Sequence, residues 1–145
     1  MNIAFLHVED KKNNPEQARK LAQIMLASVR RSIPAAHVIQ MTDFDTPALE
    51  GVDEVGRLDM DTPFFMTYRL RHLTRLKGEV LILDTDTVVL ENPSSIFDMP
   101  FDVCLTKRVK HIISTKHNYT IDDPLMPYNT GVMFSRSPAF WCAAL

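Results

Sequence analysis

Cysteine is scarce in this sequence, and neither sign of charge is in large excess. Its two cysteines, Cys104 and Cys142, have no spacing typical of a zinc site or a redox pair, so we expect reduced thiols. Sixteen basic and 18 acidic side chains give a formal net charge of −2. A protein that coats nucleic acid needs a positive field, so we expect no nucleic-acid partner.

Long apolar runs and glycine are scarce as well. The first ten residues lack a basic region, and their apolar stretch is too short for a signal peptide. No later apolar run approaches the ~18–20 residues of a membrane span. We therefore expect no transmembrane segment and a cytoplasmic location. Four glycines, without any period or low-complexity tract, exclude a repeat array.

The chain has the size and composition of one globular domain. It has 145 residues, of which 46% are hydrophobic and 23% charged. Such a chain buries about 68–70% of the surface that its unfolded form exposes, so it needs no metal or disulfide to fold. We expect a single domain over residues 1–145.

The first forty or so residues predict a β-α-β unit. Residues 3–8 form a short apolar run typical of a central strand. Asn14 and Pro15 are the N-cap and first residue of a helix that Pro34 ends, and residues 36–41 predict a second, parallel strand. The buried helix face is expected to carry four residues, Ala18, Leu21, Met25 and Val29.

A second helix is predicted after a loop over residues 42–61. Thr62 and Pro63 give its start, and Gly78 is placed to close it. Its buried stripe is expected to hold Phe65, Met66, Leu70, Leu73 and Leu76, with Arg69 at the edge of that stripe.

Alternating strands and turns fill the rest of the chain. Residues 79–84 are the strongest strand signal, with four consecutive aliphatic residues. A short helical turn at 95–97, strands at 103–106 and 128–134, and a helix from Ser137 and Pro138 follow. Together these elements predict a three-layer α/β/α fold with a mainly parallel sheet.

Asp84-Thr85-Asp86 stands where the strongest strand leaves the sheet. Side chains two apart in an extended chain point the same way, so both carboxylates can face one site. Two adjacent carboxylates raise each other's pKa unless a cation lies between them, and oxygen ligands suit Mg²⁺ or Mn²⁺. Ligands also bind at the carboxyl ends of strands in open α/β sheets. The alternative is a solvated turn, since this tripeptide is common.

Several segments, in this order and spacing, resemble the GT-A glycosyltransferases, especially the glycogenin and bacterial galactosyltransferase group. The similarity extends over nearly the whole chain, and its specific motifs occupy about a quarter of it. These motifs are Tyr68-Arg69-Leu70, Leu73 and Leu76, residues 80–89 around Asp84-Thr85-Asp86, Ile96-Phe97, and residues 128–133.

The resemblance implies a metal-dependent transferase that uses a nucleotide-diphosphate sugar, with a UDP-sugar as the expected donor. In that group's pattern, Asp86 would ligate Mn²⁺ or Mg²⁺. Asp84 would contact the same ion and, together with Thr85, the donor ribose. Arg69 would reach the diphosphate or the sugar. Three further residues, Asn129, Thr130 and Gly131, would line the sugar pocket. The end of the first strand, with His7, Val8 and Asp10, would hold the base and ribose.

Simpler interpretations of two of these motifs stay open. Arg69 has the position of a surface arginine on an amphipathic helix, and residues 129–131 fit an ordinary strand start with a bulge glycine. The acceptor, the stereochemical outcome and the oligomeric state are not specified by the sequence.

The chain departs from the family's pattern in two places. Relatives often carry an aromatic ring after the first strand, where this chain has Lys11-Lys12-Asn13. They also draw a third metal ligand, commonly His, from sequence beyond the last strand seen here. We therefore expect either a truncated form or a site completed by water or another subunit.

Two other functions compete with this prediction. The haloacid dehalogenase superfamily also ends an apolar strand in Asp-x-Asp, and Asp84 would then be the nucleophile of a phosphatase. However, only about 15 residues separate Thr106 from Asp122, too few for the helix and strand that this fold needs between them. The third candidate is a nucleotide-sugar-binding domain without turnover.

Overall fold

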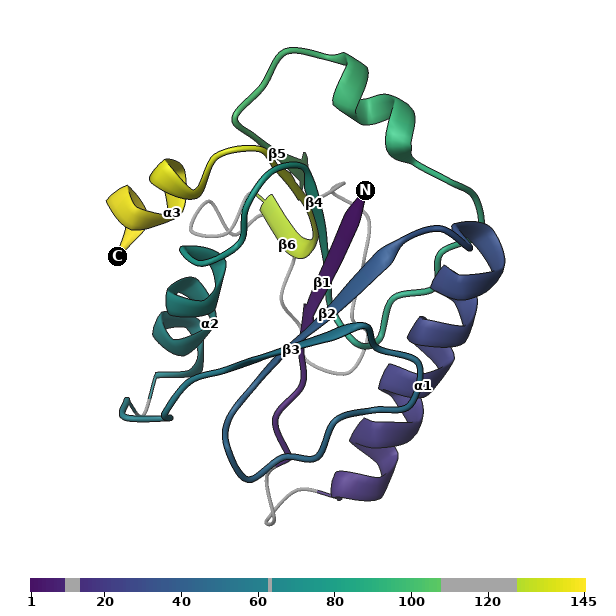
Figure 1. Ribbon diagram of the computed structural model, residues 1–145. Helices are drawn as coiled ribbons and strands as arrows, with labels where there is room; N and C mark the ends of the chain where they lie inside the picture. Colours follow the sequence, from purple (N-terminus) through teal and green to yellow (C-terminus); the bar gives the residue numbers. More distant parts are fainter. Residues whose placement is uncertain (10–13, 63, 108–127) are drawn as a thin grey trace, which may run out of the picture.

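A computed structural model describes residues 1–9, 14–62, 64–107 and 128–145 (Figure 1). Within these residues, six strands form one sheet in the order β3-β2-β1-β4-β6-β5. Their bounds are β1 Asn2–Leu6, β2 His37–Thr42, β3 Glu54–Arg57, β4 Val80–Leu83, β5 Val103–Lys107 and β6 Tyr128–Ser135. The helices are α1 Pro15–Ser32, α2 Phe65–Leu73, the 3-10 turn η1 Ser94–Asp98, and α3 Pro138–Ala144.

The sheet is mainly parallel, as predicted. β1 pairs in parallel with β2 and with β4, and β2 pairs in parallel with β3. β6 runs antiparallel to both β4 and β5, so it alone of the described strands opposes the others. The carboxyl ends of β1 and β4 consequently lie side by side at one edge of the sheet.

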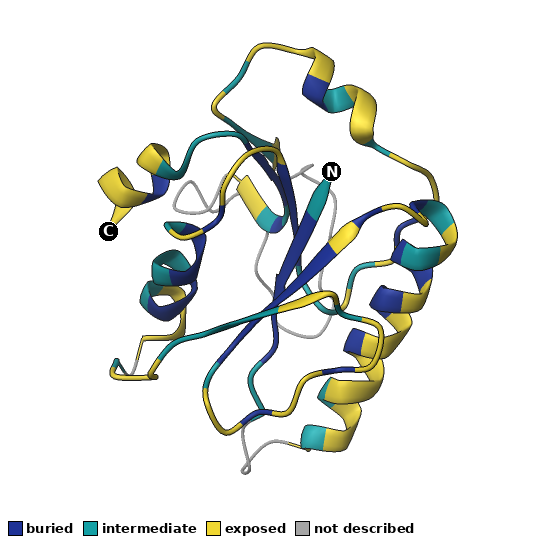
Figure 2. Cartoon of the chain, viewed as in Figure 1, coloured by how far each residue is buried: buried dark blue, intermediate teal, exposed yellow. Residues whose placement is uncertain are grey.

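Helices cover both faces of this sheet and complete the three predicted layers (Figure 1). Alternate residues of each strand serve opposite faces, so Ile3 and Phe5 pack with α1 while Ala4 and Leu6 pack toward α2 and α3. Figure 2 shows the central strands as buried and α1 as buried only toward the sheet. Of the helices in the described part of the chain, none is long and apolar enough to cross a membrane.

The predicted start of α1 is confirmed, but its buried face is partly wrong. Asn14 Oδ1 accepts a hydrogen bond from the Gln17 amide at 3.2 Å, and Pro15 is the first helical residue. Leu21 is 40% exposed instead of buried. The buried face is turned about the helix axis and contains Ala22, Met25, Leu26, Ser28 and Val29.

α2 departs further from its prediction. Phe65 and Met66 are about half exposed, whereas Arg69 is only 5% exposed and belongs to the buried face. The helix ends at Leu73 rather than near Gly78, and Phe64 is its N-cap, with no side-chain capping bond. The other residues on its buried face are Tyr68, His72 and Leu73.

The strand β3 lies inside the segment expected to be a loop. It adds to the edge of the sheet through backbone pairing, for example between Gln40 and Val55. Its four residues include Gly56 and lack an alternating apolar pattern, so the local sequence carries no strand signal. Cys104 and Cys142 are both free thiols, as expected.

Candidate functional site

Asp84 lies directly beyond the buried carboxyl end of β4. Its amide donates to the carbonyl oxygen of Gly131 at 2.8 Å, which extends the β4–β6 pairing by one residue. Its own carbonyl accepts from the Thr87 amide at 3.1 Å, so the chain turns over Thr85 and Asp86. This turn leaves Asp84 partly buried and Asp86 exposed.

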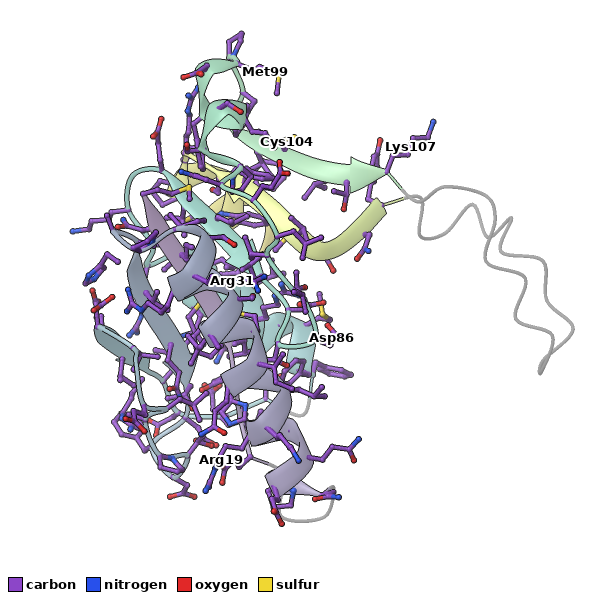
Figure 3. The ribbon with its side chains drawn as sticks, turned by 90° about the vertical axis from the view of Figure 1, so that its right-hand side faces the viewer. Arg19, Arg31, Asp86, Met99, Cys104 and Lys107 are labelled. Atoms are coloured by element: carbon purple, nitrogen blue, oxygen red, sulfur yellow. The ribbon has the colours of Figure 1, made fainter. Side chains whose placement is uncertain are left out.

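The segment after the turn is hydrogen-bonded to two serines of α1. Ser28 Oγ accepts from the Val89 amide at 3.0 Å, and Ser32 Oγ donates to the Val89 carbonyl at 2.9 Å. In Figure 3, with α1 toward the viewer, Asp86 lies beside this helix at a level between Arg19 and Arg31. The turn that carries Asp86 is thus anchored on the β4 side through Asp84 and on the α1 side through Val89.

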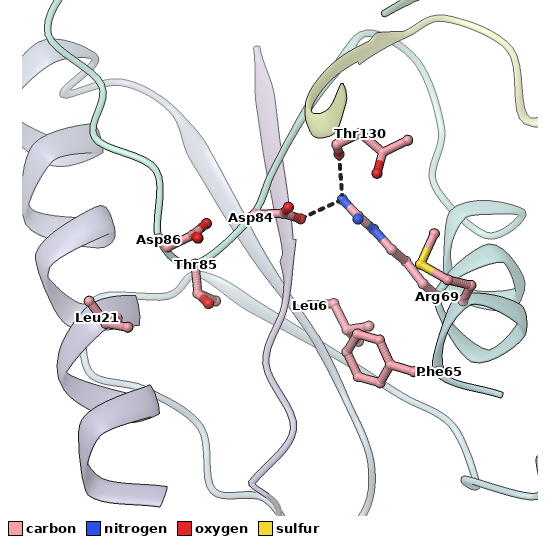
Figure 4. A pocket seen from close by; sticks show the side chains of 9 residues that line it. Leu6, Leu21, Phe65, Arg69, Asp84, Thr85, Asp86 and Thr130 are labelled. Carbon is pink, nitrogen blue, oxygen red and sulfur yellow. Dashed lines mark hydrogen bonds and ion pairs between the residues drawn. The ribbon is translucent and has the colours of Figure 1, made fainter. Parts of the chain in front are cut away.

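Arg69 connects α2 to both neighbouring strands. Its Nη2 lies 3.0 Å from Asp84 Oδ1 and donates to the Thr130 carbonyl at 3.0 Å (Figure 4). Its Nε is buried and has no hydrogen-bond partner among the described residues. The interpretation of Arg69 as a surface arginine is therefore wrong, because the guanidinium is enclosed and holds the Asp84 carboxylate.

The start of β6 brings a second set of polar atoms to Asp84. Gly131 donates its amide hydrogen to Asn129 Oδ1 at 2.8 Å, and the pairing of β5 with β6 shifts register next to these residues. A Cβ added at Gly131 would lie 3.0 Å from Asp84 Oδ2 and 3.1 Å from Asn129 Oδ1. Glycine at this position therefore leaves room for two oxygen atoms that converge beside the backbone.

Arg69, Asp84 and Thr130 border an open pocket of about 410 Å³, whose lining does not include Asn129 or Gly131. Its polar residues come from α2, the β4 turn and β6, and its apolar residues come from β1, α1 and α2 (Figure 4). The lining consists of Leu6, Leu21, Phe65, Met66, Arg69, Asp84, Thr85, Asp86 and Thr130. The pocket size is in the range typical of small-molecule sites.

The electrostatics of the pocket centre on Asp84. Burial raises the pKa of the Asp84 carboxyl above its ordinary value, and the nearby charge of Asp86 raises it further. The Arg69 guanidinium acts in the opposite direction and partly offsets both effects. A cation near the two carboxylates would favour their charged forms in the same way.

The donor chemistry of the site fits a hard divalent cation. Asp86 is exposed, and the space beside Gly131 is bordered by Asp84 Oδ2 and Asn129 Oδ1. Carboxylate and amide oxygens are the usual ligands of Mg²⁺ and Mn²⁺. Among the described residues no group of three His, Cys, Asp or Glu side chains comes together, so a cation held by Asp84 and Asp86 would need further oxygen ligands.

The predicted nucleotide residues at the end of β1 lie apart from the pocket lining. The His7 ring is 3% exposed, and burial lowers its pKa. The His7 carbonyl accepts from Thr42 Oγ1 at 2.7 Å, and neither His7 nor Val8 lines the pocket, whereas Leu6 does. Asp10 falls outside the described residues. Just before it, Glu9 forms two hydrogen bonds with Arg19 of α1, at 2.8 and 2.9 Å.

Four pocket residues were missed by sequence reasoning: Leu6, Leu21, Phe65 and Met66. Each was assigned to a strand or helix core because it is apolar and correctly spaced. The faces of α1 and α2 depend on how the helices dock on the sheet, and that orientation is a tertiary property.

Comparison with known proteins identifies the fold. No protein-family profile and no curated sequence matches the chain. Among solved structures, the galactosyltransferase LgtC in complex with donor and acceptor sugar analogs superposes with a TM-score of 0.63 at 14% identity, over 98% of this chain and 60% of LgtC. The apo form of the glycosyltransferase GlyE of Streptococcus pneumoniae TIGR4 gives 0.62 at 14% identity, over 99% of this chain and 35% of GlyE.

The chain therefore has the fold of the GT-A-like glycosyltransferases, and the predicted fold resemblance is confirmed. It spans about 60% of the length of LgtC and about a third of that of GlyE.

Proposed function

We propose that this chain binds a nucleotide-diphosphate sugar, with a UDP-sugar as the expected donor, as the donor-binding part of a metal-dependent glycosyltransferase. One observation carries the proposal. Asp84-Thr85-Asp86 follows the central strand β4 and lines the same pocket as Arg69, in a fold shared with glycosyltransferases. This is also the sheet edge at which α/β proteins commonly bind nucleotides.

Asp86 and Asp84 would hold the Mn²⁺ or Mg²⁺ ion. When bound, such an ion stabilises negative charge on the diphosphate as the glycosidic bond breaks. Asp86 is exposed to an incoming ligand, and Asp84 keeps its Oδ2 on the side away from the Arg69 contact. Thr85, between them, would contribute to binding the donor ribose.

The other predicted residues have separate roles in this proposal. Arg69 keeps the Asp84 carboxylate charged and oriented, and its guanidinium borders the space for the diphosphate or sugar. Thr130 borders the same space from β6, whereas Asn129 and Gly131 lie outside the pocket lining and would support the sugar site through the hydrogen bond from the Gly131 amide to Asn129 Oδ1. The end of β1, with His7, Val8 and Asp10, would contribute to the base and ribose site, with the buried His7 ring acting as support.

The fold argues against the phosphatase alternative, because the solved structures that it resembles are glycosyltransferases. The Arg69 contact does not separate the two functions, since it engages only Oδ1 of Asp84 and leaves Oδ2 for either role.

Calorimetry with UDP, GDP and CDP in the presence of Mn²⁺ tests the proposal. Wild type should bind one of the three nucleotides, and Asp86→Ala should bind it at least tenfold more weakly. Asp98→Ala is a matched control because Asp98 is an exposed carboxylate at the end of η1, outside the pocket. Equal affinity in wild type and Asp86→Ala would refute the metal site.

Assays of turnover separate the competing functions. Hydrolysis of the donor, or transfer of its sugar to an acceptor, would establish a transferase. Nucleotide binding without turnover would indicate a binding domain, and a covalent phosphate trapped on Asp84 would establish the phosphatase.

A further inference from the structure

The pocket has an apolar side that the proposed metal and diphosphate contacts do not use. Phe65 and Met66, in the first turn of α2, are 49% and 52% exposed. Both line the pocket, together with Leu6 at the end of β1. In Figure 4 Leu6 and Phe65 lie below the Asp84–Arg69 pair, so the pocket has a polar and an apolar side.

Leaving a large ring half exposed costs free energy, roughly in proportion to the apolar area that stays in water. The neighbouring Tyr68 and Leu73 show that α2 does have a buried face for large side chains. Phe65 lies outside that face and borders the pocket instead. Its ring therefore presents a preformed flat apolar surface to whatever occupies the pocket.

The polar side of the pocket restricts the chemistry of that occupant. The ionised carboxylates of Asp84 and Asp86 are acceptors only, so those of their oxygens that do not bind the ion select groups that donate hydrogen bonds. Arg69 supplies donors beside them. A pyranose ring combines several hydroxyl groups around its edge with C–H groups on its two faces. A pyrimidine base is also flat, but it has few donors to offer to carboxylates.

We infer that the Phe65 ring packs against the C–H face of the donor's sugar ring, while the Asp84–Arg69 side of the pocket takes its hydroxyl groups. Phe65 is thus a specificity-determining residue for the transferred hexose. The inference rests on the proposed function and assigns a definite part of the donor to the apolar side of the pocket.

The neighbouring residue provides a matched control. Phe64 is the N-cap of α2, is 70% exposed and does not line the pocket. Phe64→Ala removes the same ring from the adjacent position and leaves the pocket intact. Phe65→Tyr keeps an aromatic face, whereas Phe65→Ala removes it.

The experiment compares a nucleoside diphosphate with its hexose conjugate by calorimetry in Mn²⁺. The nucleotide is the one of UDP, GDP and CDP that wild type binds, and the conjugates are those of glucose and galactose. Phe65→Ala should weaken binding of a conjugate about 3- to 10-fold, the range expected for one aromatic contact, and should leave the free diphosphate unchanged. Phe65→Tyr and Phe64→Ala should behave as wild type, and thermal unfolding checks that all variants are folded.

Different outcomes refute the inference and the proposed function. Unchanged conjugate affinity in Phe65→Ala overturns the inference and leaves the proposed function standing. Equal weakening of the free diphosphate and the conjugate also overturns it, because the ring would then contact the nucleotide rather than the sugar. If wild type binds none of the nucleotides or conjugates, the proposed function fails and the inference fails with it.

Discussion

One nitrogen of Arg69, Nη2, lies 3.0 Å from Asp84 Oδ1 and also donates to the Thr130 carbonyl at 3.0 Å. Arg69 thereby joins α2 to the ends of β4 and β6, the two strands that deliver the polar side of the pocket. A planar guanidinium can serve two acceptors in a fixed geometry, which the point charge of a lysine does less well.

Arg69→Lys should therefore lose function while keeping the charge. We expect donor affinity to fall at least tenfold, because the Asp84 carboxylate loses its fixed orientation. The free energy of unfolding should fall by about 1–3 kcal/mol, since a buried hydrogen-bond network is broken. Calorimetry and urea unfolding measure the two effects. Wild-type donor affinity in Arg69→Lys would mean that the contact with Asp84 is incidental.

Gly131→Ala tests the close approach of β6 to Asp84. The new Cβ would lie 3.0 Å from Asp84 Oδ2 and 3.1 Å from Asn129 Oδ1, so one of these oxygens must move. We expect donor affinity to fall at least tenfold and stability to fall by about 1–2 kcal/mol. Gly56→Ala is the control, because its Cβ would meet only the Gln40 carbonyl, at 4.0 Å. A similar loss of donor affinity in both variants would contradict the prediction.

The pKa of Asp84 can be measured in the metal-free protein by NMR titration of its side-chain carboxyl carbon. Burial and the Asp86 charge raise this pKa, so Asp84 should titrate above the ordinary value of 3.8. Asp86→Asn removes the like charge and should lower the Asp84 pKa. Asp53 is an internal reference in the same spectra, since hydrogen bonds from the Val38 amide and Arg30 lower its pKa. An Asp84 pKa that does not respond to Asp86→Asn would show that the two carboxylates do not interact.

The features of the structure that could be predicted from the sequence are those set by interactions between residues close together in the chain. The strands β1 and β4 were predictable because Ile3 and Phe5, like Leu81 and Ile82, are buried whichever way the helices dock. The start of α1 was predictable because the Asn14 cap acts within three residues. The position of Asp84-Thr85-Asp86 at the end of a strand was predictable from the aliphatic residues before it, but the extended conformation expected for these three residues was wrong, because the chain turns over Thr85 and Asp86.

The remaining features depend on tertiary contacts. Arg69 is buried because Asp84 and Thr130, from distant parts of the chain, accept from it, and an isolated helix pattern cannot contain this information. Phe65 faces the pocket because α2 docks through Tyr68 and Leu73. β3 exists because β2 offers it a free edge, and its own four residues carry little β-strand propensity.

A buried histidine next to Tyr68 should make the stability of the domain depend on pH. His72 is 2% exposed, its ring centroid is 4.8 Å from that of Tyr68, and its Nε2 has no hydrogen-bond partner among the described residues. Burial, assisted by the charge of Arg75, lowers its pKa from 6.5 to about 4. The ring is therefore neutral in the folded protein at pH values where the unfolded chain already binds a proton.

The sign of the effect follows from proton binding. Between pH 6.5 and about 4 the unfolded state holds more protons at His72 than the folded state does. The free energy of unfolding therefore keeps its full His72 contribution above pH 6.5 and decreases as the pH falls through this window. The loss of stability that is due to His72 should reach about 2–3 kcal/mol near pH 4.

His72→Phe keeps an aromatic ring against Tyr68 and removes the proton site, so urea unfolding should give a flatter pH profile between pH 6.5 and 4. Above pH 7 the two profiles should have the same shape. Burial also lowers the pKa of His7, so this residue should account for part of the pH dependence that remains in the variant. An equally steep profile in His72→Phe would mean that His72 is not the group that titrates.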